Sequence, residues 1–360
     1  MGGEGQVTVT GDEGQVISDS FHSSPVTRHS SLATRHPSLV THHLSKEIMK
    51  KVTAFAPGSI GNVTCGFDVL GLAIERPGDH VDAILNGTNA LKIVEITGDG
   101  GVLPYAVEKN TAGIAVKALL AAQNLYIGID LHIHKHMPMG SGLGSSAASA
   151  VAAVVAANGL LENPLSKHEL MPFVLEAEGV ASGSVHGDNA IPSLLGGIVL
   201  MRSYNPLEIV ELPVPENLFC SVVHPDLKIL TKEARGRIPQ EVPMKKVIQQ
   251  MSNIAGFVSG LYSSDYQLIS KSLEDHLAEP YRVELIKGFP QVKQAALKAG
   301  ALNFGISGSG PSVYSFSTSL EAGQEIGKAI QATFAELAIG SRLYVSKINT
   351  KGAYLVEPAT

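Results

Sequence analysis

The sequence predicts a two-domain α+β fold, and three observations lead to this prediction. The chain has 360 residues, which at roughly 150 residues per domain suggests about two domains. Hydrophobic residues make up 44% and charged residues 17%, a composition typical of a globular protein with a sizeable core. The predicted helices and strands are interleaved, but many of the strands are adjacent in hairpins. This order favours α+β over a doubly wound parallel sheet.

The first 48 residues differ from the rest of the chain. They are rich in Ser, Thr, His and Gly and lack apolar periodicity, which predicts a disordered, dispensable extension. A plastid or other organellar transit peptide is an alternative because Ser and Arg are present, although acidic residues such as Asp12 and Glu13 argue against it. A start of the functional chain at Met49 is a third reading. We expect one domain over residues 49–213 and a second over 214–360, because Pro213 and Pro215 interrupt the strands there.

In the first domain, strands are expected at residues 52–56, 69–74, 80–85 and 91–97. Asn86-Gly87 predicts a hairpin between the last two. Asn110 is a suitable N-cap for a helix over 111–124. Apolar and polar residues alternate over 128–136, which predicts a half-buried strand. The later elements follow from the same patterns: helices at 145–161, 166–179, 245–262, 263–276, 291–299 and 319–337, and strands at 198–201, 209–212, 219–224, 312–316 and 342–348.

Charge, apolar runs and cysteines exclude several classes of protein. The net charge is -6 and the sequence has no run of basic residues, so we expect no nucleic-acid partner. The longest apolar stretch, about 15 residues at 147–161, is too short to cross a bilayer. Cys65 and Cys220 lie far apart in the sequence, which predicts reduced thiols and a cytoplasmic location.

A Gly- and Ser-rich segment, PMGSGLGSSAA at residues 138–148, follows the alternating strand. Glycine lets backbone N–H groups approach a ligand closely, and the start of the next helix favours anions. The segment therefore predicts a phosphate-binding loop. It is not a Walker A loop, because no Lys follows its last Gly. A dinucleotide fingerprint matches Gly142, Gly144 and Ala147, but helical sequence up to Glu162 leaves no room for the strand that it requires. A loop used only for packing remains the third alternative.

Residues 138–148 resemble the second signature of the GHMP kinases, and residues 305–311 (GISGSGP) resemble the third. Residues 56–71 and 183–192 resemble the form found in the branch of the family that phosphorylates L-homoserine in threonine biosynthesis. The resemblance covers about residues 49–357. It implies an N-terminal domain of the ribosomal protein S5 domain 2 type and a C-terminal ferredoxin-like α/β sandwich. It also implies ATP as phosphate donor, Mg²⁺ as metal and L-homoserine as acceptor.

The same resemblance implies the roles of individual residues. Arg235 and Arg282 would hold the substrate carboxylate, a task that suits the planar guanidinium, and Asp68 would receive the ammonium group. Asn62, Asn189 and His186 would lie at the accepting hydroxyl as catalytic and substrate-binding residues. Glu178 and Ser146 would bind Mg²⁺, and Asn110 would border the adenine. The phosphates of ATP would lie on Pro138, Met139, Gly140, Ser141, Gly142, Leu143, Gly144, Ser145, Ser146, Ala147 and Ala148.

Some questions stay open at the level of sequence. Several relatives use an Asp–Lys pair as general base, but no Lys lies close to Asp68 or Asp188 in the sequence. We therefore expect catalysis without a strong base, and Asp188 either orients its loop or His186. A kinase for another alcohol, such as mevalonate or shikimate, and a GHMP-fold sensor without turnover are the alternative functions. A homodimer is an open alternative.

Three alternating histidines, His132, His134 and His136, span about 13 Å and cannot share one metal ion, so we expect them to face solvent.

Overall fold

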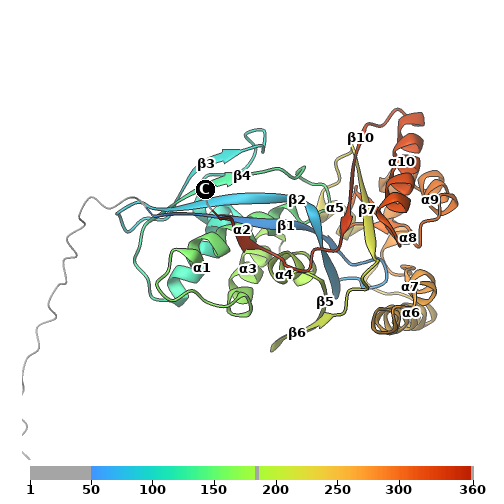
Figure 1. Ribbon diagram of the computed structural model, residues 1–360, viewed down its shortest axis with the longest axis horizontal. Helices are drawn as coiled ribbons and strands as arrows, with labels where there is room; N and C mark the ends of the chain where they lie inside the picture. The colour runs from blue at the N-terminus through green and yellow to red at the C-terminus, as the bar shows by residue number, and fades with distance from the viewer. Residues whose placement is uncertain (1–49, 183–185, 358–360) are drawn as a thin grey trace, which may run out of the picture. The chain divides into compact units, whose positions relative to one another are not determined.

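Two β-sheets and their covering helices make up residues 50–182 and 186–357, the part of the chain that the computed structural model describes (Figure 1). In this part, the first sheet has the strand order β11-β1-β2-β4-β3, with β5 paired to β2 and β6 to β5. The second sheet has the order β10-β7-β9-β8. The strands are β1 (Lys51–Gly61), β2 (Leu70–Leu85), β3 (Lys92–Thr97), β4 (Ile129–His134), β5 (Ile198–Tyr204), β6 (Leu207–Leu212), β7 (Phe219–Pro225), β8 (Gly305–Ile306), β9 (Val313–Ser317), β10 (Ser341–Lys347) and β11 (Tyr354–Leu355).

Four helices lie on one side of the first sheet, as Figure 1 shows. They are α1 (Thr111–Ala122), α2 (Ser145–Gly159), α3 (Lys167–Ser182) and α4 (Gly187–Leu195). Helices α2 and α4 contact the strands of the sheet, and α1 and α3 pack against α2 and against each other. Helix α2 is the central one, because it contacts β1, β2, α1, α3 and α4. Its side chains are mostly Ala, Val and Ser and nearly all of them are buried. Small side chains let this helix lie close to the sheet, and the Ser59 N–H of β1 donates to the Leu143 carbonyl of the loop before the helix at 3.0 Å.

The second half of the chain builds a separate apolar cluster around the second sheet. Helices α9 (Phe289–Lys298) and α10 (Leu320–Glu336) pack against each other, and α10 covers β7, β9 and β10. Phe289, Phe304, Ile326 and Phe334 are buried in this cluster. The remaining α-helices of the described residues are α5 (Thr231–Gly236), α6 (Met244–Ser263), α7 (Tyr266–Ser272) and α8 (Glu279–Arg282), and two short 3₁₀ helices lie at Val107–Lys109 and Val283–Leu285.

The predicted α+β class is confirmed, but the first sheet differs from the prediction in several strands. The strand expected at 52–56 continues to Gly61 as β1. The strands expected at 69–74 and 80–85 are one strand, β2, because its pairing with β1 continues along both segments with one register shift between Pro57 and Ser59. The hairpin expected at Asn86-Gly87 is wrong. Strand β4 pairs antiparallel with β2 and parallel with β3, so it lies between them. The Asn86 side chain donates to Asp130 of β4 and to the Ala90 carbonyl, which directs the turn past β4.

The sequence patterns missed the helices α4, α5 and α8 and the two-residue strands β8 and β11, and the helix expected at 263–276 is the shorter α7. Asp265 caps α7 by accepting hydrogen bonds from the N–H groups of Gln267 and Leu268. The expectations for residues 1–48 and for residues 183–185 lie outside the described residues. The domain boundary near Pro213–Pro215 stays a prediction, although the chain passes from the first sheet to the second between β6 and β7.

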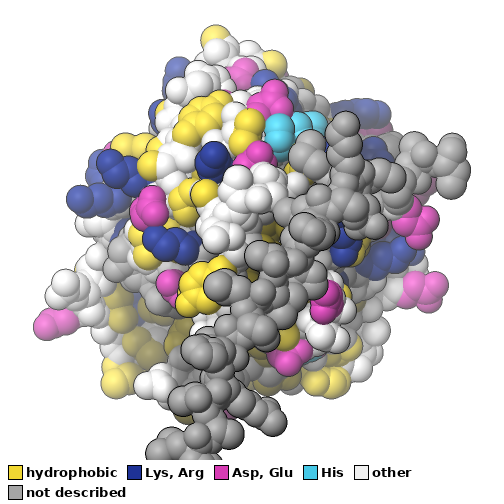
Figure 2. Space-filling view, turned by 90° about the vertical axis from the view of Figure 1, so that its left-hand side faces the viewer, with side chains coloured by type: hydrophobic (Ala, Val, Ile, Leu, Met, Phe, Trp, Pro, Cys, Tyr) yellow, Lys and Arg dark blue, Asp and Glu magenta, His cyan; other side chains and the backbone are white. Residues whose placement is uncertain are grey.

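Charged side chains of both signs are mixed on the surface, as expected for a sequence of modest net charge (Figure 2). On the face shown in Figure 2, Lys and Arg side chains are interspersed with Asp, Glu and apolar side chains. Within residues 50–182 and 186–357, no helix is both long enough and apolar enough to cross a membrane.

Candidate active site

The Gly-rich loop and residues 305–311 lie against each other through backbone contacts. The Ser307 hydroxyl donates to the Gly142 carbonyl at 2.7 Å, and the Ser312 N–H donates to the Ser141 carbonyl at 3.1 Å. A Cβ on Gly142 would lie 2.4 Å from the Ser307 carbonyl oxygen, and the φ angle of Gly142 is 78°. A larger residue would therefore separate the two loops. The two Gly-rich segments singled out in the sequence form one structural unit.

Asn62 connects this unit to the segment that follows β1. Residues Asn62, Val63 and Thr64 all have positive φ, which is unusual for β-branched side chains and marks a strained turn. The Asn62 side chain accepts from the Asp68 N–H and donates to the Gly308 carbonyl, both at 3.0 Å. Its own N–H donates to the Asp188 carboxylate at 3.1 Å. Asn62 thus holds the Asp68 turn, the 305–311 loop and the start of α4 together.

A cavity of about 370 Å³ opens between these segments. Its walls include the loop residues Gly140, Ser141, Gly142, Gly144, Ser145, Ser146 and Ala147. It also brings together all the residues expected to bind the acceptor or the metal: Asn62, Asp68, Ser146, Glu178, His186, Asn189, Arg235 and Arg282. Leu143 and Ala148 are instead buried in the core, and Pro138 lines neither this cavity nor the neighbouring one.

The neighbouring cavity, about 340 Å³, contains Asn110 and Met139 in its wall and shares Gly140, Ser145 and Ser146 with the first. The Asn110 side chain caps α1: it accepts from the Ala112 N–H at 3.0 Å and donates to the Pro104 carbonyl at 2.9 Å. The N-cap prediction is therefore confirmed. The Ser146 hydroxyl donates to Thr111 at the start of α1 at 3.2 Å.

Asp68 and Arg235, expected to bind opposite ends of the substrate, are bonded to each other. The guanidinium of Arg235 donates to both carboxylate oxygens of Asp68, at 2.7 and 2.8 Å. It also lies 3.0 Å from Nε2 of His186. Arg282 is more deeply buried and donates to the Gly308 carbonyl at 2.9 Å. Both guanidinium groups lie over the ring of Phe67, with the Cζ atoms 5.2 Å and 5.6 Å from its centroid.

Two other carboxylates of this cavity, those of Glu178 and Asp188, have raised pKa values. Burial, reinforced by the charge of Asp188, raises the pKa of Glu178 to about 7. Burial, reinforced by the charge of Asp68, raises the pKa of Asp188 to about 6. Mg²⁺ prefers oxygen ligands and retains several waters, so the Glu178 carboxylate and Ser146 hydroxyl fit it. A cation beside Glu178 would also relieve the unfavourable burial of that charge.

The contacts of the histidines of β4 and of Asp68 bear on two other expectations from the sequence. His132 lies 3.1 Å from Glu95 and His134 lies 3.4 Å from Asp82, so the two histidines contact different carboxylates. The partner of Asp68 is Arg235 rather than a lysine, although Lys232 lines the same cavity. Thr231, Lys232 and Ser309 were not singled out in the sequence, and only their proximity to Arg235 and to the 305–311 loop could have indicated them.

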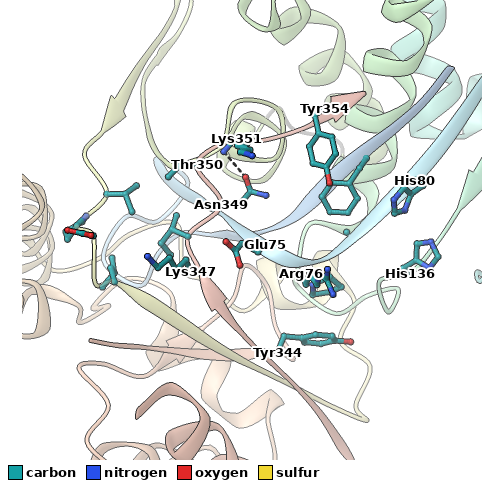
Figure 3. A pocket seen from close by; sticks show the side chains of 18 residues that line it. Glu75, Arg76, His80, His136, Tyr344, Lys347, Asn349, Thr350, Lys351 and Tyr354 are labelled. Atoms are coloured by element: carbon teal, nitrogen blue, oxygen red, sulfur yellow. Dashed lines mark hydrogen bonds between the residues drawn. The ribbon is translucent and has the colours of Figure 1, made fainter. Parts of the chain in front are cut away.

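A larger cavity, about 1200 Å³, contains none of the expected site residues in its wall (Figure 3). Arg76, His80 and Tyr354 from the first sheet and Tyr344 and Lys347 from β10 line it. It lacks a Gly-rich loop or a helix N-terminus among its described lining residues. The cavity beside the Gly-rich loop therefore has the chemistry of a phosphate site, and the largest of the three cavities does not.

Comparison with known proteins gives the family. The model of the GHMP kinases N-terminal domain matches residues 110–197, and that of the GHMP kinases C-terminal region matches residues 257–336. A homoserine kinase from Chlorobium phaeobacteroides (strain BS1) is 46% identical over 320 residues, which cover 86% of this chain and 100% of the relative. The chain belongs to the homoserine kinases of the GHMP kinase family. The resemblance read from the sequence is thus confirmed, and membership of this kinase family implies the use of ATP.

Other members of the family agree with this assignment. A homoserine kinase from Xanthomonas campestris pv. campestris (strain B100) is 40% identical over 308 residues, covering 86% of this chain and 95% of the relative. The crystal structure of homoserine kinase from Cytophaga hutchinsonii superimposes with a TM-score of 0.84 and 47% identity, covering 87% of this chain and 100% of that one. Mevalonate kinase from L. major, at 17% identity and a TM-score of 0.66 over 85% and 99% of the two chains, shares the fold. The two-domain GHMP kinase fold is therefore confirmed as well.

Proposed function

We propose that this chain transfers the γ-phosphoryl group of ATP to the side-chain hydroxyl of L-homoserine, giving O-phospho-L-homoserine for threonine biosynthesis. One observation carries the proposal. A single cavity contains the Gly-rich loop on one side and Asp68, Arg235 and Arg282 on the other. The loop suits a phosphate chain, and the three charged side chains suit the carboxylate and ammonium groups of an amino acid.

The acceptor would replace the ion pair between Asp68 and Arg235. The ammonium group takes Asp68 and the carboxylate takes Arg235, so both side chains keep a partner of opposite charge. The Arg235 side chain is 39% exposed and the Asp68 side chain 24%, and ion pairs exposed to this extent contribute little stability. Opening the pair therefore costs little. Arg282, held by the Gly308 carbonyl, supplies the second guanidinium for the carboxylate.

ATP would lie across the two adjoining cavities. The adenine enters the one with Asn110 in its wall, and the phosphates lie on the loop residues shared by both. Backbone N–H groups at the start of α2 bind the phosphates, which is consistent with the absence of a Walker-type Lys after the last Gly. Glu178 and Ser146 would hold Mg²⁺, which when bound neutralises phosphate charge.

The residues near the hydroxyl act mainly by positioning. Both polar atoms of the Asn62 side chain already bond to backbone groups, so we assign it the task of holding Asp68 and the 305–311 loop. His186 and Asn189 orient the hydroxyl toward the γ-phosphorus. Phosphoryl transfer through a loose transition state depends on such alignment and on charge stabilisation. It does not require a strong general base.

The test is a coupled ADP-release assay with L-homoserine, L-serine, mevalonate and shikimate in parallel. We expect the highest kcat/KM for L-homoserine. L-Serine, which is one methylene shorter, should be lower by about 10–200-fold. A preference for mevalonate or shikimate would contradict the proposal in favour of another acceptor. ATP binding without turnover of any of the four would identify a sensor.

A further inference from the structure

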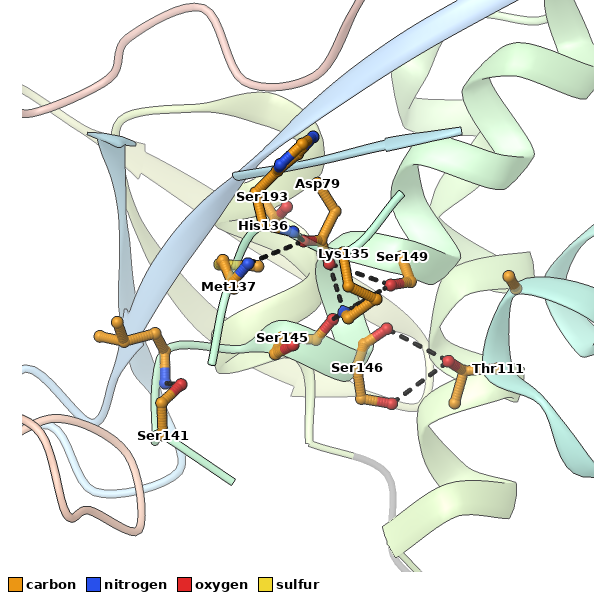
Figure 4. Close-up of polar contacts among 12 residues, drawn as sticks. Asp79, Thr111, Lys135, His136, Met137, Ser141, Ser145, Ser146, Ser149 and Ser193 are labelled. Atoms are coloured by element: carbon orange, nitrogen blue, oxygen red, sulfur yellow. Dashed lines mark hydrogen bonds and ion pairs between the residues drawn. The ribbon is translucent and has the colours of Figure 1, made fainter. Parts of the chain in front are cut away.

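A buried ion pair lies directly beneath the Gly-rich loop (Figure 4). Its members are Asp79 of β2 and Lys135, the residue after β4, and their side chains are 0% and 2% exposed. The Lys135 ammonium donates to the Asp79 carboxylate, to the Ser145 carbonyl at 2.7 Å and to the Ser149 hydroxyl at 2.7 Å. Ser145 and Ser149 belong to the first turns of α2. Lys135 therefore connects β2 to the helix end that faces the phosphate site.

The same carboxylate also holds the chain where it enters the loop. The other oxygen of Asp79 accepts from the N–H groups of His136 and Met137, at 2.9 and 3.2 Å. These two residues immediately precede the loop at 138–148. The Ser149 hydroxyl donates to Asp79 as well, at 3.0 Å. One side chain thus anchors the segment before the loop and, directly and through Lys135, the helix after it.

Lys135 lines the Asn110 cavity together with Ser145 and Ser149, but its hydrogen bonds leave it no free donor for a ligand there. An ammonium group has three N–H donors, and the three acceptors Asp79, Ser145 and Ser149 use all of them. Lys135 therefore differs from a P-loop lysine, which points at phosphate. Burial lowers the pKa of Lys135, and the charge of Asp79 opposes that shift.

The charges of the pair matter for an anion site. A lone carboxylate beneath the N-terminal turn of α2 would repel the phosphates that bind at that turn. A lone ammonium there would oppose the helix dipole and would have to be buried without a partner. Together the two charges cancel, so the positive end of the helix stays available to the ligand.

We propose that Asp79 and Lys135 form a positioning pair for nucleotide binding, which fixes both ends of the phosphate loop and keeps the base of α2 electrically neutral. The pair acts through the loop and does not touch the phosphates. The inference deepens the proposed function and rests on it only for the identity of the anion, the phosphate chain of ATP. It does not depend on which alcohol accepts the phosphoryl group.

The first experiment measures nucleotide binding to the full chain carrying Lys135→Met, in the absence of acceptor. Calorimetric titration with ATP, tripolyphosphate and adenosine reports the phosphate and base contacts separately. We expect the Kd for ATP and for tripolyphosphate to rise on the order of tenfold to hundredfold, and the Kd for adenosine to stay within about twofold. In the coupled assay, KM for ATP should rise while KM for L-homoserine changes by less than about twofold.

A double variant separates charge balance from simple loss of structure. Asp79→Asn combined with Lys135→Met removes both charges, and the amide oxygen can still accept from His136 and Met137. We expect this variant to bind tripolyphosphate more tightly than Lys135→Met does. Lys117→Met is the matched control, because it breaks an exposed ion pair between Lys117 of α1 and Glu108 of the short 3₁₀ helix before α1 (Val107–Lys109), whose side chains are 59% and 66% exposed. That control should bind ATP like the wild type.

Three results would overturn the inference. A folded Lys135→Met variant with wild-type affinity for tripolyphosphate would reduce the pair to a contribution to stability. A double variant that binds no better than the single one would refute charge balance. An equal loss for adenosine would point to the wall of the Asn110 cavity instead of the loop. If Lys135→Met does not fold, the double variant is compared with the wild type instead. It lacks the hydrogen bonds of Lys135 to α2, so we expect its Kd for tripolyphosphate to be raised and its Kd for adenosine to be unchanged. Because no acceptor is present, failure of the homoserine proposal would leave these measurements unaffected.

Discussion

Two carboxylate–cation pairs lie on the two sides of the phosphate loop, and their surroundings differ. Asp68 and Arg235 face the acceptor cavity and are partly exposed, with bidentate contacts at 2.7 and 2.8 Å. Asp79 and Lys135 lie beneath the loop and are almost fully buried, and each makes further hydrogen bonds to the loop ends or to α2. The same kind of ion pair therefore occurs once where water and a substrate can reach it and once where both side chains are almost fully buried.

This difference explains how a site for an amino acid, which carries both an ammonium and a carboxylate group, can be stable and still accessible to its ligand. A partly exposed pair contributes little to stability and can exchange its partners. A buried pair contributes little in net terms too, but removal of one partner leaves a desolvated charge and is costly. We therefore expect substitutions in the two pairs to affect different measurements.

The largest expected effect is on stability. Asp79→Ala should lower the free energy of unfolding by about 3–5 kcal/mol, because it leaves the Lys135 charge buried without its partner. Asp68→Ala should lower it by less than about 1 kcal/mol. Urea denaturation of the two variants at pH 7 measures both values. Equal losses would contradict the distinction between the two pairs.

The second effect concerns the acceptor cavity and depends on pH. The pKa of Asp188 is raised from 3.8 to about 6, so the folded protein binds its proton more tightly than the unfolded chain does. The stability that this carboxyl contributes is present below pH 3.8 and is lost as the pH rises through about 6. Relative to Asp188→Asn, the wild type should lose about 2–3 kcal/mol of unfolding free energy between pH 4 and pH 7. A pH-independent difference between the two proteins in urea denaturation would refute the raised pKa.

The third effect is on substrate recognition. Arg282→Ala removes charge-assisted hydrogen bonds worth about 1.5–3 kcal/mol. We expect kcat/KM for L-homoserine to fall by about tenfold to hundredfold, while KM for ATP stays close to the wild-type value. Steady-state kinetics with each substrate varied in turn provide the measurement. Unchanged kinetics for L-homoserine would exclude Arg282 from carboxylate binding.

The smallest effect is expected for the exposed pair used as a control. Lys117→Met breaks the 3.0 Å contact between Lys117 of α1 and Glu108 of the 3₁₀ helix before α1. Surface pairs of this kind contribute about 0.2–1 kcal/mol, so thermal or urea unfolding should change within that range. A larger loss would show that α1 depends on this pair more than its exposure suggests.

The site could be predicted from the sequence to the extent that short segments carry their own chemistry. The glycines of residues 138–148 and 305–311 predicted two loops that accept close backbone contacts, and Gly142 meets Ser307 in this way. Other patterns were misleading because they are local. Asn86-Gly87 has the chemistry of a hairpin turn, but the partner of β2 is β4, more than 40 residues farther along the chain.

The burial of Lys135 could be predicted from neighbouring residues, but its ion-pair partner could not. In the alternating segment after residue 128, Lys135 falls on the same face as Ile129, Leu131 and Ile133, and that face is buried. The alternation alone thus indicates a buried lysine. Its partner Asp79 could not be found in the same way. The antiparallel register of β2 and β4, with His80 opposite His134, sets that pairing.

The sequence by itself determined the family, the α+β class and the residue types available for phosphate and amino-acid binding, because Gly spacing, periodicity and side-chain chemistry are properties of short segments. Only the tertiary structure decided which charges meet. The pairing of Asp68 with Arg235 joins residues 167 positions apart, and that of Asp79 with Lys135 joins residues 56 positions apart. Burial then separates an exchangeable pair from a permanent one, and burial follows from how the strands and helices pack around each residue.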